Sequence, residues 1–287
     1  MKQFYLITNR MKDAALVTTN WIRDELRKRG ACCTVHVQEE SGGCYYTDSR
    51  EIPADCDCII VLGGDGTLLE AARDTVDLDI PLIGVNLGTL GYLAEVDREN
   101  LSGALERLCK DDYTIEHRMM LEGQIMGETE CRRSYALNDI VVSRSGSLQM
   151  LHFHILVNGH FLKGYSADGI IVSTPTGSTG YNMSAGGPIV EPSAELMVIT
   201  PICPHTLNTR SIVLSPNDEV EIELLPARDG RTQQVEADFD GAHGMALTAG
   251  ERMRIIRSER TTAIVKLSDA GFLEVLHRKM REEGSVL

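Results

Sequence analysis

Hydrophobic runs and helix-spaced apolar residues alternate along the first third of the chain. Residues 4–8 form a short apolar run, and residues 13–29 then carry apolar side chains at helical spacing before Gly30, which suits a C-terminal helix cap. This pattern predicts a strand followed by a helix. Further strands are expected at 34–37, 58–62 and 80–85, and a helix at 68–76. Alternation of this kind indicates a Rossmann-like α/β domain, in which helices cover a parallel sheet.

The pattern changes after about residue 116, where short apolar runs are divided by Gly, Pro, Asn and Asp. Asn158-Gly159 separates two such runs and predicts a two-residue hairpin turn, because both turn positions need positive φ. The second part is therefore expected to be all-β with antiparallel strands. Strands are expected at 122–126, 139–143, 152–157, 161–165, 169–173, 197–200, 220–225, 253–256 and 263–267, and a terminal helix at 272–281.

Two domains follow from this change of pattern. Residues 1–117 form the expected α/β domain and residues 118–269 the expected β-rich domain. The terminal helix, in residues 270–287, is expected to pack back on the first domain. The boundary is placed only to within several residues, since no linker-like or low-complexity stretch marks it.

Composition and charge narrow the class of protein. The 287 residues are 43% hydrophobic and 24% charged, which is enough apolar material for a folded core. The formal charge of −14 opposes general binding to nucleic acid or an anionic membrane, so an anionic substrate needs local donors or a metal. The chain has no apolar run of about 18 residues, as a spanning helix requires, and no signal-peptide core, so a soluble cytoplasmic protein is expected.

The eight cysteines have no CxxC spacing and are expected to be reduced thiols rather than disulfides or a structural zinc site. Cys56 and Cys58 lead straight into an apolar strand. Packing at the strand end explains them better than metal binding.

The sharpest local feature is a glycine-rich loop that joins a predicted strand to a predicted helix. Gly63, Gly64, Gly66 and Thr67 surround Asp65, and such a loop brings backbone N–H groups close to a phosphate. The Lys of a P-loop is absent. Asp65 could accept a proton from an attacking hydroxyl, position that hydroxyl or hold Mg²⁺. The alternative is an Asx turn that closes the connection.

A second glycine cluster spans 86–92 and follows the next predicted strand. Two such loops at the carboxyl ends of parallel strands would line one crevice, where open α/β sheets bind ligands. Gly91 and Tyr92 belong to this cluster. Tyr92 could pack on a base or a sugar, or it could fill an ordinary position at the sheet edge.

The longest candidate segment spans 168–188, where a strand runs into a loop rich in glycine and hydroxyl side chains. Pro175 and Pro188 stiffen the loop, and Tyr181 is an unusual residue for a flexible connection. A loop of this length and composition usually binds a ligand. The candidates within it are Asp168, Thr176, Thr179, Gly180, Tyr181 and Ser184.

These segments together resemble the bacterial NAD kinases, in the family's order and over nearly the whole chain. The resemblance is carried by Gly63-Gly64-Asp65-Gly66-Thr67, Asn138-Asp139, the 168–188 stretch, Cys203-Pro204-His205-Thr206-Leu207 and Asp240-Gly241. The 168–188 stretch is the specific part. The Gly-Gly-Asp-Gly loop is shared with diacylglycerol and sphingosine kinases and, in variant form, with phosphofructokinases.

The resemblance implies a reaction and its participants. A phosphoryl group passes from ATP, or in some members from polyphosphate, to the 2′-hydroxyl of the adenosine ribose of NAD, with Mg²⁺ required. It also implies a homodimer or homotetramer, a β-sandwich for the second domain and an active site in the cleft between the domains.

The resemblance also implies roles for individual residues. Asp65 is the acid-base residue and Gly63, Gly64, Gly66 and Thr67 bind phosphate. Asn138 and Asp139 contact the adenosine part of NAD, although a cap or turn at a strand start is the alternative. Asp168 reaches the nicotinamide end in its own or a neighbouring subunit. The remaining expected NAD contacts are Gly66, Gly91, Tyr92, Thr176, Thr179, Gly180, Tyr181, Ser184 and Asp240, the last of which could instead be only a turn residue.

Two positions depart from the family pattern. Gly180 replaces the Ala of many members, and Asp139 replaces a Glu. Affinity is expected to shift while the reaction stays the same. His205 is expected to be structural. The competing functions are a lipid kinase that shares the glycine loop and a dinucleotide-binding sensor without turnover.

Overall fold

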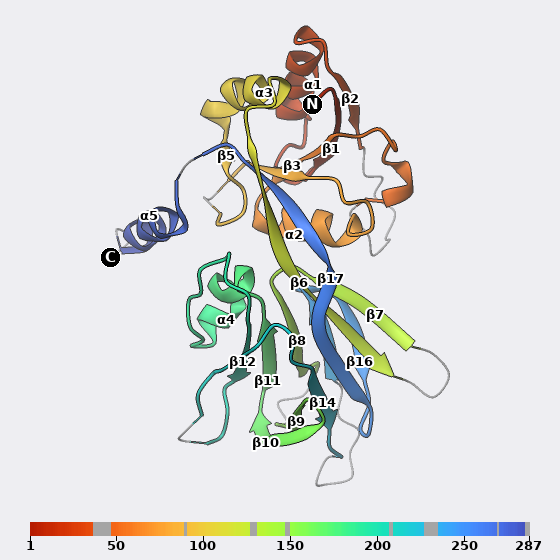
Figure 1. Cartoon of the computed structure of the whole chain (residues 1–287), viewed down its shortest axis with the longest axis vertical. Helices are drawn as coiled ribbons and strands as arrows, with labels where there is room; N and C mark the ends of the chain where they lie inside the picture. The colour runs from red at the N-terminus through yellow and green to blue at the C-terminus, as the bar shows by residue number, and fades with distance from the viewer. Residues whose placement is uncertain are drawn as a thin grey trace. The chain divides into compact units, whose positions relative to one another are not determined.

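The computed structural model describes residues 1–36, 47–88, 91–126, 131–146, 150–206, 209–226, 235–268 and 270–284 (Figure 1). The chain divides into two compact units. The first comprises Met1–His117 and Thr262–Leu287, and the second comprises Arg118–Thr261. The strands β6 (Thr114–Met126) and β17 (Arg252–Lys266) each contribute residues to both units.

A parallel sheet forms the centre of the first unit. Its order is β2 (Cys32–Val35), β1 (Gln3–Thr8), β3 (Cys58–Gly63) and β4 (Leu82–Asn86). The short strand β5 (Val96–Asp97) and the end of β17 also pair with β4 in parallel. Every residue of β3 and β4 is buried, as expected for parallel strands that are covered on both faces. The predicted α/β fold is confirmed.

The helices of the first unit lie on both sides of this sheet. Helices α1 (Val17–Lys28) and α3 (Leu101–Cys109) share a core with β1 and β3, and α2 (Asp65–Asp74) lies on the opposite side (Figure 1). The unit also contains the short turns η1 (Ser49–Glu51) and η2 (Arg98–Asn100) and the terminal helix α5 (Phe272–Gly284). Asp13 accepts hydrogen bonds from the backbone N–H groups of Thr18 and Thr19 in the first turn of α1. The helix therefore begins at Val17 rather than at residue 13.

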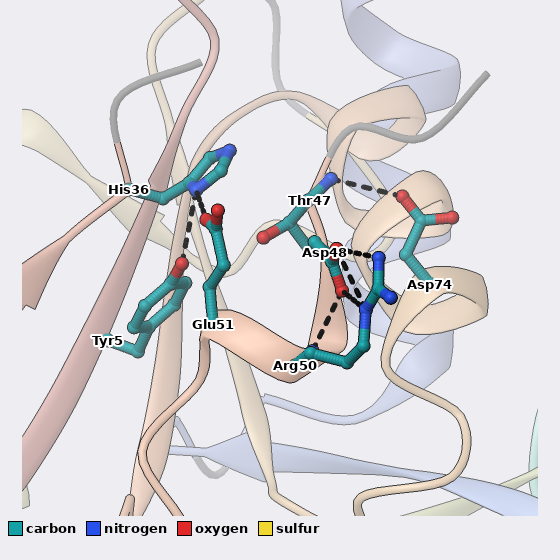
Figure 2. A network of polar contacts seen from close by, with 7 residues as sticks. All are labelled: Tyr5, His36, Thr47, Asp48, Arg50, Glu51 and Asp74. Atoms are coloured by element: carbon teal, nitrogen blue, oxygen red, sulfur yellow. Dashed lines mark hydrogen bonds and ion pairs between the residues drawn. The ribbon is translucent and has the colours of Figure 1, made fainter. Parts of the chain in front are cut away.

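A polar network fastens η1 to the sheet and to α2 (Figure 2). The hydroxyl of Tyr5 in β1 lies 3.1 Å from Nδ1 of His36, and the same nitrogen lies 3.1 Å from Oε2 of Glu51 in η1. The N–H of Thr47 donates to Asp74 of α2 at 3.3 Å. Burial raises the pKa of the Tyr5 hydroxyl, which therefore stays protonated in this network.

The second unit contains two sheets. The first has the order β10 (His160–Ala167), β9 (Leu151–Val157), β14 (Val220–Leu224) and β17, with β6 beside β17 and β7 (Cys131–Ala136) beside β6. The second has the order β13 (Ile212–Leu214), β12 (Met197–Ile202), β11 (Gly169–Ser173), β8 (Asp139–Arg144), β15 (Val235–Phe239) and β16 (Ala242–Leu247). Phe153 from the first sheet and Phe239 from the second share one buried core. The predicted β-sandwich is confirmed.

The predicted hairpin in the second unit is confirmed. Asn158 and Gly159 have φ of 51° and 74°, and they join the antiparallel strands β9 and β10. The expectation of two separate strands at 253–256 and 263–267 was wrong. They are a single strand, β17, and the polar residues between them do not break it: Glu259 and Arg260 are exposed, whereas Ser258 and Thr262 are buried.

The described thiols are free, and burial makes Cys33 and Cys58 unreactive. The cysteines that the structure describes form no disulfides, as expected. Cys58 is buried in the first core, and burial raises the pKa of the Cys33 thiol to about 12. These side chains therefore pack rather than react. None of the helices among the described residues is long and apolar enough to cross a membrane.

Candidate functional site

Two glycine-rich loops meet at the carboxyl ends of β3 and β4. The N–H of Leu87 donates to the carbonyl of Gly63, and the side chain of Asn86 closes a turn by accepting from the N–H of Gly88. A Cβ on Gly63 would overlap the side chain of Thr67, so only glycine fits where the strand passes into α2. The sequence prediction of adjacent loops is met for the part of the second loop that the structure describes.

The carboxylate of Asp65 ties these loops together. It accepts hydrogen bonds from the N–H groups of Tyr92 at 2.6 Å and of Leu93 and Ala94 at 3.1 Å each. A Cβ on Gly91 would overlap this carboxylate, which explains the glycine there. The partners lie 27 to 29 residues away, so Asp65 organises a remote loop rather than a local Asx turn.

The hydrogen bonds of Asp65 leave one carboxylate oxygen with an unused acceptor position. Oδ1 accepts from both Leu93 and Ala94, whereas Oδ2 accepts from Tyr92. Each carboxylate oxygen has about two acceptor positions. Among these contacts, Oδ2 is the oxygen that can still accept a hydroxyl.

Tyr92 has a partner within the first unit. Nζ of Lys279 in α5 lies 4.0 Å from the centroid of its ring, in cation–π geometry. The terminal helix therefore contacts the second glycine loop. Whether the ring also packs on a base or sugar stays a prediction.

In the second unit, Asp240 holds the backbone that carries two further candidates. Its carboxylate accepts hydrogen bonds from the N–H groups of Leu137 at 2.8 Å, Asn138 at 2.7 Å and Asp139 at 3.1 Å. Asp240 has φ of 54° and lies in the turn between β15 and β16 with Gly241. It is therefore a turn residue whose side chain also fixes the start of β8.

Asn138 is partly buried and Asp139 is buried, and both carry polar atoms that are shielded from water. Oδ1 of Asn138 is buried and has no hydrogen-bond partner among the described residues. Asp139 is nearly fully buried, and burial, with the negative charge of Asp240 as a second cause, raises its pKa to about 7. Near neutral pH this carboxyl group can therefore donate or accept a hydrogen bond. An unpaired amide oxygen beside such a group favours a bound polar ligand.

The loop after β11 packs directly on this pair. It contains η3 (Thr176–Thr179) and α4 (Tyr181–Ser184), and a Cβ on Gly177 would overlap the backbone of Asn138. A Cβ on Gly180 would lie 3.4 Å from Nδ2 of Asn138, so the alanine of many family members would contact the same amide. The segment 176–184 therefore packs directly against the pair Asn138-Asp139.

Asn182 holds this loop together by hydrogen bonds, although no sequence pattern singles it out. The buried Nδ2 donates to the carbonyls of Ser178 at 3.1 Å and Pro188 at 3.0 Å, and Thr200 donates to Oδ1 at 2.7 Å. Tyr181, in contrast, is 47% exposed. A fixed loop with an exposed aromatic ring is suited to packing on a ligand.

Asp168 is not brought together with these residues. It precedes β11, whereas the loop follows β11, and a five-residue strand separates its ends by about 16 Å. The carboxylate pairs with Arg144, with Nε to Oδ1 and Nη2 to Oδ2 both at 3.2 Å. This position leaves open the expectation that Asp168 serves a neighbouring subunit.

Two family models, which describe two domains of one enzyme family, match residues in both units of this chain. The model described as ATP-NAD kinase N-terminal domain matches residues 45–113, and the model described as ATP-NAD kinase C-terminal domain matches residues 137–267. The NAD kinase of Lachnospira eligens is 45% identical over 98% of this chain and 100% of its own length. The NAD kinase of Lachnoclostridium phytofermentans is 43% identical over 99% and 100%.

Solved structures share the fold at lower identity. The NAD kinase of Archaeoglobus fulgidus in complex with ATP matches with a TM-score of 0.78 and 23% identity, covering 97% of this chain and 99% of the other. The yeast NADH kinase complexed with NADH matches with a TM-score of 0.78 and 22% identity, covering 96% and 86%. The two-unit fold is therefore shared with both enzymes.

Proposed function

The chain belongs to the ATP-NAD kinase family, and we propose that it transfers the γ-phosphoryl group of ATP to the 2′-hydroxyl of the adenosine ribose of NAD, producing NADP. Family membership makes it an NAD⁺ kinase, a phosphotransferase with an alcohol group as acceptor. The observation that carries the detailed proposal is the Asp65 carboxylate, which is held by three N–H groups at the start of α2 with Oδ2 able to accept a hydroxyl.

Asp65 supplies the acid-base chemistry in this proposal. A ribose hydroxyl is a weak nucleophile at neutral pH, so its proton leaves late, as the transferred group passes through a loose transition state. The bond from the ribose 2′-oxygen to the γ-phosphorus forms, the bond from that phosphorus to the β,γ-bridging oxygen breaks, and ADP leaves. Oδ2 of Asp65 accepts the proton. Positioning of the hydroxyl supplies most of the rate enhancement.

The described residues fit a magnesium ion only if the substrate phosphates and waters hold most of it. The described residues contain no group of three or more His, Cys, Asp or Glu side chains that could hold a metal. Mg²⁺ usually takes only one or two protein carboxylates and fills its shell with waters and substrate phosphates. When bound, it would offset the negative charge of the phosphates, and waters and phosphate oxygens would supply its ligands, because the open position on Oδ2 of Asp65 serves the hydroxyl.

The residues of the second unit are proposed to bind NAD. The orphan Oδ1 of Asn138 would accept a hydrogen bond from the adenosine part, and Asp139 would donate to it or accept from it. Tyr181 would pack on the dinucleotide from its rigid loop, with Thr176, Thr179, Gly180 and Ser184 beside it. Asp240 would act through the backbone of residues 137–139. A homodimer or homotetramer and a cytoplasmic location belong to the same proposal.

The direct test measures NADP production. Purified protein is incubated with Mg²⁺, NAD and either ATP or polyphosphate, and NADP is followed with an NADP-specific dehydrogenase. We expect product with ATP. Tight NADP binding without product would favour a sensor, and phosphorylation of a lipid instead of NAD would favour a lipid kinase.

The role of Asp65 is tested with Asp65→Asn beside Glu70→Gln, a matched control in which a carboxylate on the same helix is neutralised. We expect Asp65→Asn to keep NAD binding and lose most turnover, because its amide cannot accept the proton. Glu70→Gln should behave like wild type. Wild-type turnover in Asp65→Asn would remove Asp65 from the mechanism.

A further inference from the structure

Lys12 lies over both glycine loops, although its sequence position, between β1 and α1, does not mark it as a site residue. A Cβ built on Gly64 would lie 2.7 Å from Nζ of Lys12, and one built on Gly88 would lie 3.5 Å from it. Gly64 follows β3 and Gly88 follows β4. The ammonium group is therefore next to both loops at the carboxyl ends of adjacent parallel strands, where open α/β sheets bind ligands.

The segment that carries Lys12 is fastened at both ends. The backbone N–H of Asn9 donates to the carbonyl of Leu62, and its Nδ2 donates to Oγ1 of Thr67 at 3.1 Å. The N–H of Lys12 donates to the carbonyl of Asn9, and Asp13 caps the start of α1. The backbone beneath Lys12 is thus tied to the same glycine loop that its side chain reaches.

The charge of Lys12 has no partner in the described part of the chain. Lys28, Lys110 and Lys266, also in the first unit, each pair with a glutamate at 2.5–3.1 Å, whereas Lys12 forms no ion pair among the described residues. Lys12 is also exposed, so an incoming anion can reach it.

The position of this cation is unfavourable without an anion. Gly64 is the N-cap of α2, and the N-terminus of a helix carries partial positive charge that repels a neighbouring ammonium group. The nearby carboxylate of Asp65 is already engaged by the N–H groups of residues 92–94. A bound polyanion would satisfy the ammonium group and the free N–H groups of α2 together.

We propose that Lys12 binds the phosphate chain of the phosphoryl donor, whether that chain belongs to ATP or to inorganic polyphosphate. This inference rests on the proposed function and names a binding residue for the donor at that same site. The net charge of −14 supports the same inference, because a protein that repels polyanions at long range needs a local cation to hold one.

The test separates binding from turnover. Binding of ATP and, in a second arm, of inorganic tripolyphosphate is measured by calorimetry on wild type, Lys12→Met, Lys12→Arg and Lys28→Met. Lys28 is the matched control, an exposed lysine of the same unit that pairs with Glu25. A charged hydrogen bond to phosphate is worth about a tenfold to hundredfold in affinity, so we expect Lys12→Met to lose that much for both ligands.

The remaining variants and the kinetics complete the test. Lys12→Arg should keep most of the affinity because it retains the charge, and Lys28→Met should match wild type. In NADP production, Lys12→Met should raise the KM for ATP and leave the KM for NAD unchanged. ATP should also raise the Tm of wild type more than that of Lys12→Met.

Two outcomes would overturn the inference. Equal affinity of wild type and Lys12→Met for both ATP and tripolyphosphate would remove Lys12 from the donor site. A fall in NAD affinity that matches the fall in ATP affinity would indicate a general structural role. Failure of the proposed function would look different, because wild type itself would then bind ATP without forming NADP.

Discussion

Two aspartates of this chain, Asp65 and Asp240, use their carboxylates in the same way. Each accepts hydrogen bonds from three consecutive backbone N–H groups, those of residues 92–94 for Asp65 and of residues 137–139 for Asp240. In each case the partner segment is remote in sequence. From the sequence, Asp65 was a candidate acid-base residue and Asp240 was either a site residue or only a turn residue. Only the fold brings the N–H groups to the two carboxylates.

The first prediction at the residue scale concerns Gly91. Gly91→Ala places a methyl group onto the Asp65 carboxylate and must displace either that side chain or the loop. We expect turnover to fall by about tenfold or more, because small errors in the position of a catalytic group are costly. The measurement is kcat for NADP production.

Gly103→Ala in α3 is the control for Gly91→Ala, since nothing lies within 4 Å of a Cβ there. It should keep wild-type turnover and leave the Tm unchanged or slightly raised, because alanine favours a helix over glycine. Wild-type kcat in Gly91→Ala would show that the position of Asp65 is not critical.

The second prediction concerns the pH dependence that Asp139 causes. Burial raises its pKa to about 7 in the folded protein, above its ordinary value of 3.8. Between these two values the folded chain binds more protons than the unfolded chain, so this group's contribution to stability is lost as the pH rises toward 7. Asp139→Asn lacks the ionisation. Its Tm relative to that of wild type should therefore increase from pH 5 to pH 8.

The same substitution separates stability from binding. Ionisation turns Asp139 from a hydrogen-bond donor into an acceptor, so the KM for NAD of wild type should change near pH 7. That change should be absent in Asp139→Asn. Parallel profiles of Tm against pH in the two proteins would contradict the raised pKa.

At the scale of elements, the turn between β15 and β16 acts as a clamp on the start of β8. Asp240→Ala leaves the N–H groups of residues 137–139 without their acceptor, and we expect a loss of about 1–3 kcal/mol in the free energy of unfolding. Denaturant titration measures it. Affinity for NAD should fall as well, because Asn138 and Asp139 lose their fixed backbone.

Asp240→Asn is the informative companion of this variant. Asparagine tolerates the φ of 54° at this position, and its amide oxygen can still accept hydrogen bonds. It should recover a large part of both stability and affinity. Equal losses in the two variants would mean that the negative charge, rather than the acceptor, holds the segment.

The elements themselves were predictable to different degrees. Buried parallel strands such as β3 follow from short apolar runs, and Asn158-Gly159 fixed its hairpin. Helix α3 was not predicted, although Leu101, Ala104, Leu105 and Leu108 have helical spacing and are buried. Helix α2 was expected to begin at residue 68 but begins at Asp65, because tertiary contacts of the glycine loop override weak helix propensity.

The site residues likewise include some that the sequence identified and some that it did not. Asp65 and the 168–188 stretch were found through composition and family resemblance. Lys12 and Asn182 were not, because their importance arises from contacts with Gly64 in one case and with Ser178 and Pro188 in the other. Pairings between distant segments carry no local pattern in a single sequence. Both residues can therefore be recognised as important only from their contacts in the structure.

At the scale of the whole molecule, the open question is whether one chain completes a site. Asp168 lies at the opposite end of β11 from the loop that packs on Asn138, so it is a candidate for a contact with the neighbouring subunit in the proposed homodimer or homotetramer. Light scattering behind size exclusion should give about two or four times the chain mass of 31.6 kDa. A mass of one chain would end this proposal.

Mixing two inactive variants decides where Asp168 acts. Asp65→Asn and Asp168→Ala are unfolded together in equal amounts and refolded. If Asp168 serves its neighbour, each mixed pair contains one site with both native aspartates, and random pairing restores about a quarter of wild-type activity. If Asp168 serves its own chain, every site carries one substitution and no activity returns. Refolded wild type, treated identically, sets the scale, and each variant refolded alone sets the background.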